Sequence, residues 1–280
     1  GKTAATVNLA VALKNAGQRV GIFDADLHGP SVPKMLGIKK ETNLNGAFWL
    51  DPVVTASEIK ALSVALFWPG DMTPVMWRGQ TKSRTIRQLL SAAKWGGLDY
   101  LLVDLPPGTG DEPIAILKSI PDLDGVIIVT TPQEVSTLVC SKAINASLTL
   151  GAKVIGLIEN MSVYNCRCCG DAVHLFGKDK GKQLARMMEI PFLGSIPIDP
   201  LFSEAADTGV PIVNLHPESI TAKAFVEIAK TLNAQMPPKE VPEAPPEESK
   251  PCPGAGHHHH QHGQNEGCSH PHHHHHNHMN

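Results

Sequence analysis

LDYLLVDLPPG, residues 98–108, is an almost unbroken apolar run that ends on a carboxylate and turns through proline and glycine. Such a run is typical of a strand that is buried on both faces of a sheet. Four further runs have the same form, at residues 19–26, 124–132, 152–160 and 190–200. Helix-like stretches separate most of them. This alternation predicts an α/β fold with a doubly wound, mostly parallel sheet and helices on both faces.

Apolar residues at helical spacing mark the segments between these runs. Residues 3–16 and 81–96 have this spacing, and residues 217–236 read as a closing helix. Beyond residue 236 the chain is rich in proline and glutamate and cannot bury a core. We therefore predict three parts: a folded domain, a linker and a disordered histidine-rich tail, over residues 1–235, 236–256 and 257–280.

The tail holds twelve of the fifteen histidines, all beyond Gly256, so its composition needs an interpretation. Imidazole suits nickel, zinc, copper and iron ions, and the thiols of Cys252 and Cys268 lie close enough in sequence to join. The same composition also fits a solvated segment that binds nothing. Both interpretations stay open: an additional transition metal on the tail, or none.

Charge and composition exclude several classes of protein. The 280 residues carry a formal net charge of −3, which argues against wholesale binding of nucleic acid. No apolar run is long enough to span a membrane, and we expect neither a membrane partner nor a signal peptide. Six cysteines in a chain of this length do not form a disulfide framework, which favours a reducing cytoplasm.

The chain opens with GKTAATVNLA, and its first three residues have the form of the end of a phosphate-binding loop. In such a loop, backbone N–H groups and a lysine hold phosphate oxygens, and the final hydroxyl binds Mg²⁺. A chance tripeptide is the alternative, but Gly1, Lys2 and Thr3 stand directly at a predicted helix start. Because only the end of the loop is present, we expect the first strand and the rest of the loop to precede Gly1.

Carboxylates end two of the predicted strands. Asp24 and Asp26 close the run at residues 19–26, while Asp104 closes the first run quoted above and Gly108 follows it. The C-terminal ends of parallel strands meet at one edge of a sheet, where open α/β folds bind ligands. Carboxylates there can hold Mg²⁺ and orient water, and a glycine N–H can meet a terminal phosphate. The alternative is that these aspartates are helix caps or parts of ordinary turns. The succession of three such elements, GKT at a helix start and then the two strand ends, makes this alternative improbable.

NCRCCGD contains a CxxC pair, Cys166 and Cys169, with Cys168 between them. Two thiolates are half of a tetrahedral metal site. Zinc within one chain lacks a second pair, because Cys140 lies in a helix-like segment. A redox pair normally starts a helix after a strand, whereas NMSVYN, which precedes this pair, is interpreted as a polar loop. A disulfide does not suit a reducing compartment. The fourth interpretation is that two chains each give a CxxC pair to one 4Fe–4S cluster.

Together these motifs resemble the Mrp/ApbC branch of the MinD/ParA-like P-loop ATPases, which carry iron–sulfur clusters. The resemblance covers residues 1–233, and DADLHGPSVPKMLG and DYLLVDLPPGTGD are its specific stretches. More widely shared stretches are GKT and TTPQ. The remaining stretches, which also occur in the family's order, are TPVMWRGQTKSRTIRQLL, IENMSVYNCRCCG, LFGK and FLGSIPIDP. The resemblance implies a P-loop NTPase fold and an ATP hydrolase that uses Mg²⁺.

The resemblance also assigns roles to residues. Lys2 would neutralise the terminal phosphates and Asp26 would orient the attacking water, so these two are the predicted catalytic residues. Thr3 and Asp104 would bind Mg²⁺. The predicted nucleotide-binding residues are Gly1, Lys2, Thr3, Gly108, Asn160 and Asp199, of which the last two would line the adenine pocket.

Cys166 and Cys169 would bind a 4Fe–4S cluster shared between the subunits of a homodimer. The implied function is an ATP-dependent carrier or scaffold that transfers the cluster to apo iron–sulfur proteins. The chain departs from the family in three ways. It lacks the further lysine of the motif KGGVGK, Ala4 stands where a threonine often helps to bind the α-phosphate, and Cys168 fills a position that usually lacks a thiol.

Two other functions fit parts of the pattern. A MinD/ParA-like positioning or partitioning ATPase would require a basic patch or a C-terminal amphipathic helix, and the acidic linker and histidine-rich tail supply neither. A metal-insertion NTPase for nickel would use the tail. Such enzymes often prefer GTP, and the sequence lacks the guanine-binding motif NKxD.

Overall fold

The computed structural model describes residues 1–39, 50–67, 79–107, 111–120 and 122–238. All of them belong to one unit, Gly1–Glu243. The predicted nucleotide ligand Gly108, the linker from residue 239 onward and the histidine-rich tail lie outside the described residues. Among the helices that are described, none is both long and apolar enough to cross a membrane.

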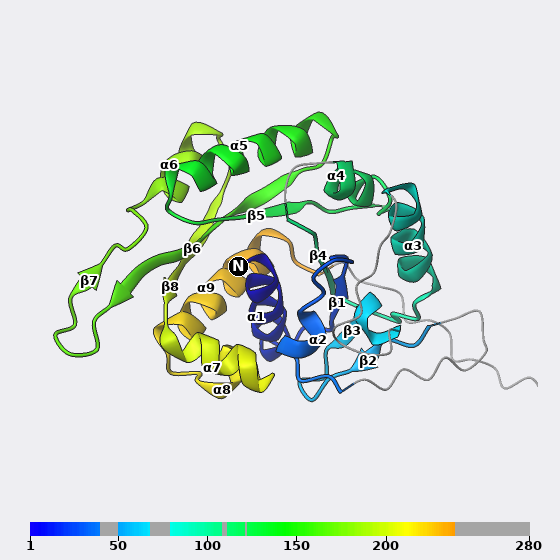
Figure 1. The fold of residues 1–280 in the computed structure, drawn as a ribbon, viewed down its shortest axis with the longest axis horizontal. Helices are drawn as coiled ribbons and strands as arrows, with labels where there is room; N and C mark the ends of the chain where they lie inside the picture. Colours follow the sequence, from blue (N-terminus) through cyan, green and yellow to red (C-terminus); the bar gives the residue numbers. More distant parts are fainter. Residues whose placement is uncertain (40–49, 68–78, 108–110, 121, 239–280) are drawn as a thin grey trace, which may run out of the picture. The chain divides into compact units, whose positions relative to one another are not determined.

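The elements alternate along the chain as the apolar runs predict (Figure 1). The strands are β1 (Val20–Asp24), β2 (Val53–Val54), β3 (Lys60–Ser63), β4 (Tyr100–Asp104), β5 (Val126–Thr130), β6 (Val154–Asn165), β7 (Ala172–Val173) and β8 (Phe192–Ile198). The helices are α1 (Lys2–Asn15), α2 (Val32–Met35), η1 (Val64–Phe67), α3 (Gly79–Ala92), α4 (Asp111–Leu117), α5 (Glu134–Thr149), α6 (Lys180–Met187), α7 (Pro200–Thr208), α8 (Ile212–Leu215) and α9 (Ile220–Gln235).

The strands form two four-stranded sheets. The first has the order β2-β3-β1-β4, with β1 parallel to both neighbours and β2 antiparallel to β3. In the second, β6 is parallel to β5 and β8 and antiparallel to β7. The doubly wound, mostly parallel fold is therefore as predicted, but its strands are divided between two sheets. Apolar runs specify strands and cannot specify which strands share hydrogen bonds.

Three apolar clusters hold the layers together. One contains α1, α9 and side chains from one face of both sheets, including Ile22 of β1 and Ile158 of β6. The opposite face of the first sheet packs against α3 and α4 through Phe23, Leu62 and Ile86. The opposite face of the second sheet is covered by α5 and α6 (Figure 1). Helices therefore cover both faces, and α1 is buried because it lies in the layer that the two sheets share.

The segment before the cysteines is a strand, which corrects its interpretation as a polar loop. β6 continues to Asn165, and Tyr164 pairs with Ile198 of β8 and Val173 of β7. The side chain of Ser162 is buried and donates a hydrogen bond to the Ile196 carbonyl at 3.1 Å. The polar side chain of Ser162 thus satisfies its hydrogen bond inside the sheet, where composition alone suggests a loop.

The closing helix α9 is fixed at both ends. Ser219 caps its start, since its hydroxyl accepts a hydrogen bond from the Ala222 N–H at 3.0 Å. At its end, the Tyr100 hydroxyl lies 2.6 Å from the Met236 carbonyl oxygen and 2.9 Å from Asn233 Oδ1. Tyr100 is the first residue of β4, so the last described residues lie near the strand end that is opposite Asp104.

Candidate functional site

The start of α1 meets the end of β4. The Thr3 hydroxyl donates a hydrogen bond of 2.6 Å to Asp104 Oδ2, and the Thr6 hydroxyl lies 3.2 Å from Oδ1 of the same carboxylate. Both hydroxyls come from one turn of α1, which begins directly after Gly1. The two predicted Mg²⁺ ligands, Thr3 and Asp104, are therefore in direct contact although 101 positions separate them.

The Asp104 carboxyl has little contact with solvent. Its side chain is buried, and this burial raises the pKa of the carboxyl above its ordinary range. The hydrogen bonds from Thr3 and Thr6 and the charge of Lys2 act in the opposite direction, while Asp26 raises the pKa further. A buried carboxylate beside a hydroxyl offers hard oxygen ligands, and a divalent cation would restore the balance of charge there.

Asp24 and Asp26 differ sharply in their surroundings. Asp24 is fully buried and pairs in register with Asp104 of the neighbouring strand. Its carboxylate accepts hydrogen bonds from the Ser63 hydroxyl at 3.1 Å and from the backbone N–H groups of Asp26 and Val32 at 3.2 and 3.3 Å. Burial, reinforced by the charge of Asp104, raises the pKa of Asp24 to about 7.

These contacts give Asp24 a role that the sequence does not assign to it. Its carboxylate fastens the start and the end of the loop after β1 to the sheet. Asp26 stands within that loop, where its Oδ1 accepts the backbone N–H groups of His28 and Gly29, both at 3.1 Å. Asp24 therefore positions the loop, and Asp26 is the carboxylate that the loop presents.

Asn160 lies beside the first residue of α1. A side-chain carbon added to Gly1 would lie 3.0 Å from Asn160 Nδ2, so the two residues are close neighbours. Asn160 Oδ1 accepts the Met161 N–H at 2.9 Å, in a turn where Met161 has a positive φ of 57°. Two of the predicted nucleotide-binding residues are thus adjacent, which leaves the amide Nδ2 of Asn160 facing the helix start.

Asp199 follows the end of β8 and caps α7. Its Oδ1 accepts the Leu201 N–H at 3.1 Å and also lies 3.4 Å from Arg167 Nη2. Arg167 belongs to the CxxC turn, so this ion pair joins the predicted cysteine site to the predicted adenine pocket. Asp199 is nearly buried, with 8% of its side chain exposed, whereas 58% of the Arg167 side chain is exposed.

The cysteines occupy the turn at the tip of the β6–β7 hairpin. The Cys166 N–H donates to the Asp171 carbonyl at 2.9 Å, and the Gly170 N–H donates to the Cys166 carbonyl at 2.8 Å. Backbone hydrogen bonds from Cys169 and then Cys168 lower the pKa of the Cys166 thiol, with smaller help from the two neighbouring thiols. The turn therefore stabilises a thiolate, the form that binds metals.

The thiols of the turn remain reduced and reachable. Cys168 and Cys169 are exposed, Cys166 is half-buried, and Cys169 Sγ lies 3.2 Å from Asp171 Oδ2. Cys140 is buried in α5. Within the described ranges, no three or more histidine, cysteine, aspartate or glutamate side chains are arranged to hold a metal ion.

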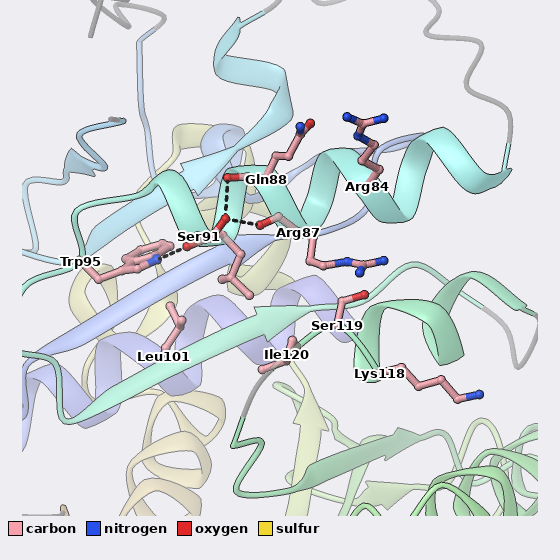
Figure 2. A pocket seen from close by; sticks show the side chains of 10 residues that line it. Arg84, Arg87, Gln88, Ser91, Trp95, Leu101, Lys118, Ser119 and Ile120 are labelled. Carbon is pink, nitrogen blue, oxygen red and sulfur yellow. Dashed lines mark hydrogen bonds between the residues drawn. The ribbon is translucent and has the colours of Figure 1, made fainter. Parts of the chain in front are cut away.

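A cavity of about 870 Å³ lies elsewhere, between α3, β4 and the end of α4 (Figure 2). Its polar lining includes Arg84, Arg87 and Lys118, and Leu101 of β4 forms part of its apolar lining. None of the predicted site residues lines this cavity. It runs along β4, which is the last strand of its sheet, and it is separate from the carboxylates at the C-terminal end of that strand.

Comparison with known proteins gives the same assignment as the motifs. Residues 1–233 match the family described as ParA: NUBPL iron-transfer P-loop NTPase. A Methanocaldococcus jannaschii protein named iron-sulfur cluster carrier protein is 47% identical over 232 residues, covering 83% of this chain and 79% of the relative. A Danio rerio protein named cytosolic Fe-S cluster assembly factor nubp2 is 40% identical over 238 residues, covering 83% and 88%.

Solved structures share the fold. A nucleotide-binding protein of Archaeoglobus fulgidus, solved in complex with ADP, is 36% identical with a TM-score of 0.67, covering 78% of this chain and 84% of that one. The septum site-determining protein MinD of Pyrococcus horikoshii has a TM-score of 0.62 at 24% identity, covering 83% and 90%, and indicates the fold alone. The resemblance inferred from the motifs is confirmed: the chain belongs to the NUBPL iron-transfer P-loop NTPases of the ParA family.

Proposed function

We propose that this protein is an ATP hydrolase that carries a 4Fe–4S cluster between two copies of itself and delivers it to apo iron–sulfur proteins. One observation carries the proposal: a reduced, reachable CxxC turn that offers two thiolates and, among the described residues, no further ligands. The iron–sulfur carriers among its relatives support it. The cluster is cargo, and a Cys₄ set made by two chains is the donor set it needs.

The turn is suited to cargo that must leave again. Cys169 is exposed and Cys166 is half-buried, so a recipient's thiols can approach the iron atoms without unfolding the hairpin. The backbone N–H groups of Cys169 and Cys168 stabilise the Cys166 thiolate. Exposed free thiols also suit a reducing compartment, and the cytoplasm remains our proposal for it.

The nucleotide site is proposed at the start of α1. Gly1 and Lys2 would hold phosphate oxygens, the Asn160 amide and Asp199 would face the base, and Gly108 remains a proposed ligand on sequence grounds. Thr3 and Asp104 fit Mg²⁺, because a hydroxyl and a buried carboxylate oxygen lie 2.6 Å apart and the carboxyl is short of positive charge. When bound, Mg²⁺ supplies charge neutralisation of the phosphates.

The protein's own groups would do the rest of the hydrolysis. Asp26 orients the attacking water with the carboxylate oxygens that its loop leaves accessible, and Lys2 neutralises charge on the terminal phosphate. Asp24 keeps that loop in place through its three hydrogen bonds. Asp24 itself is buried behind the loop, so its role is positioning.

The ion pair between Arg167 and Asp199 connects the proposed cluster site with the proposed nucleotide site. A nucleotide that displaces Asp199 would pull on the residue that stands between Cys166 and Cys168. We propose that this contact, together with the change of dimer geometry on hydrolysis, adjusts how exposed the cluster is.

The deciding experiment is anaerobic reconstitution of the chain with iron and sulfide. We expect about two iron atoms per chain, the content of one shared 4Fe–4S cluster, and transfer of the cluster to an apo-ferredoxin. Replacement of both Cys166 and Cys169 by serine abolishes uptake, whereas Cys168→Ser, the matched control in the same turn, keeps it. Full uptake by the double variant would remove the assignment of the cysteines.

The histidine-rich tail supports a second proposal of its own, an additional transition-metal site. Its composition alone carries this proposal, because the tail lies outside the described residues. Titration with nickel and zinc compares the full chain with a chain ending at Met236. Equal stoichiometry in the two would leave the tail as a solvated segment.

A further inference from the structure

The cysteine turn holds one thiol more than the proposed cluster needs. Two chains that each give Cys166 and Cys169 complete a Cys₄ set, which leaves Cys168 without a role. Cys168 is exposed, like Cys169, whereas Cys166 is half-buried where the turn leaves β6. Because a 4Fe–4S cluster takes four cysteine ligands, Cys168 can bind its iron only after another thiolate has left.

Both neighbouring thiols of the turn act on Cys166. The backbone N–H groups of Cys169 and Cys168 contribute most to the lowered pKa of Cys166, and the thiols of the same two residues add to it as hydrogen-bond donors. Neither thiol is therefore turned away from the Cys166 sulfur. The CxxC spacing singles out Cys169 as the partner of Cys166, but the fold of the turn also keeps Cys168 within reach.

Asp171 offers Cys169 a partner other than iron. The Asp171 Oδ2 atom lies 3.2 Å from Cys169 Sγ. A carboxylate oxygen accepts a hydrogen bond from a thiol, whereas a thiolate has no proton to donate. This contact is therefore made when Cys169 is free of iron. Asp171 can bind the Cys169 side chain after it has left a cluster.

The tip of the hairpin has room to rearrange, whereas the segment that returns from it is packed. Gly177, which follows the exposed Phe176, has a φ of 107°, and a side-chain carbon on it would lie 2.8 Å from the Pro132 carbonyl oxygen. At the tip, Gly170 has a φ of 77°, and a side-chain carbon there would meet no atom within 4 Å. The residues next to Gly170 can therefore change conformation while the return segment stays in place.

We propose that Cys168 is an exchange ligand, which takes over the iron atom that Cys169 holds while the cluster passes to a recipient. The inference rests on the proposed function, because it concerns the same bound cluster. In this ligand substitution the bond between iron and Cys169 Sγ breaks, and a bond between that iron and Cys168 Sγ forms. The proton of the Cys168 thiol passes through solvent to the Cys169 thiolate. The charge of the cluster and the oxidation states of its iron atoms do not change.

The exchange keeps the cluster attached when one ligand leaves. Because Cys168 is the chain neighbour of Cys169, its effective concentration at the iron is far above that of a thiol in solution. The chain then holds the cluster by Cys166 and Cys168 instead of by Cys166 alone. Since Cys168 is exposed, a recipient's thiolates can approach the iron that it has taken over.

Iron uptake by alanine variants of the full chain in anaerobic reconstitution tests the exchange, because alanine cannot bind iron. We expect Cys169→Ala to keep about half or more of the iron of the unaltered chain, and Cys168→Ala/Cys169→Ala to keep about a tenth or less. Cys140→Ala removes a buried cysteine outside the turn and is the matched control, with full uptake. Equal loss of iron from Cys169→Ala and the double variant would overturn the inference.

The loaded chains provide two further measurements. We expect transfer to apo-ferredoxin, measured per bound cluster, to be about fivefold or more slower in Cys168→Ala than in Cys140→Ala. Equal transfer rates would contradict the exchange. Tandem mass spectrometry after alkylation of the unaltered chain is expected to show partial protection of both Cys168 and Cys169. Full protection of Cys169 with none of Cys168 would show a fixed ligand and overturn the inference, whereas absence of iron in the unaltered chain would overturn the proposed function itself.

Discussion

Asp24 makes the stability of this protein depend on pH in a direction opposite to that of most carboxylates. Its pKa is about 7 in the folded protein, against an ordinary value of 3.8. Between these two values the folded state holds a proton that the unfolded state has lost. The free energy of unfolding therefore falls as pH rises from about 4 to about 7 and is constant above.

The magnitude follows from the two pKa values. Each pKa unit corresponds to about 1.4 kcal/mol, and integration between pH 5 and pH 8 gives a loss of about 2.6 kcal/mol from Asp24 alone. Asp24→Asn removes this titration but keeps one oxygen that accepts hydrogen bonds. The NH₂ group of the new asparagine would face a backbone N–H group, so two donors would meet without an acceptor. We expect this to lower the free energy of unfolding by about 1 kcal/mol at every pH.

The assay is urea unfolding of the unaltered chain and of Asp24→Asn at pH 5 and pH 8, without nucleotide and with EDTA. We expect the stability of the variant relative to the unaltered chain to rise by about 2–3 kcal/mol between these two pH values. A thermal scan would show a relative gain of about 5–10 °C for a domain of this size. The other titrating groups are common to both proteins, so parallel pH profiles would refute the reasoning.

Three further substitutions test single contacts. Thr6→Val, nearly isosteric, removes the 3.2 Å hydrogen bond to Asp104 and is expected to lower the unfolding free energy by about 1 kcal/mol in urea titrations; no change would mean that the bond is weak. Glu159→Ala removes the buried carboxylate that accepts the Gly181 N–H at the start of α6, and we expect it to lower the free energy of unfolding by about 1–3 kcal/mol. Glu159→Gln keeps an acceptor oxygen and is expected to lower it less. Equal losses in the two variants would contradict the capping role. Arg167→Gln is expected to change the free energy of unfolding by no more than about 0.5 kcal/mol, because the ion pair with Asp199 is partly exposed. The same variant is expected to abolish any effect of ATP on the rate at which the cysteines of the turn are alkylated, measured by mass spectrometry. A preserved effect of ATP would refute the link to Asp199.

The sequence predicted the candidate site best where carboxylates end the apolar runs. Asp24 and Asp104 could each be placed at the end of a strand, and they are the last residues of β1 and β4. That these two strands are neighbours could not be predicted. The division of labour between Asp24 and Asp26 could not be predicted, because it depends on hydrogen bonds from Ser63 and Val32, which reach Asp24 only after the chain has folded.

The surroundings of the cysteines were the hardest part to predict. Polar side chains in β6 suggested a loop, yet Ser162 is buried and bonded to the neighbouring strand. The contact between Arg167 and Asp199 joins residues 32 positions apart and has no signal in either motif. Gly177 has such a signal in hindsight, because a glycine beside exposed apolar residues indicates a close approach of backbone.

The anchoring of the last helix by Tyr100 has a practical consequence for measurements on this protein. Tyr100 begins β4 and Asp104 ends it, so about 13 Å of strand separates the Met236 carbonyl from the carboxylate proposed to bind Mg²⁺. A fluorophore attached at Met236 would sit on a fixed point of the framework, away from the moving parts of the reaction. Paired with a dye on the β6–β7 hairpin, it would report the motion of the cysteine turn in real time during single turnovers of ATP.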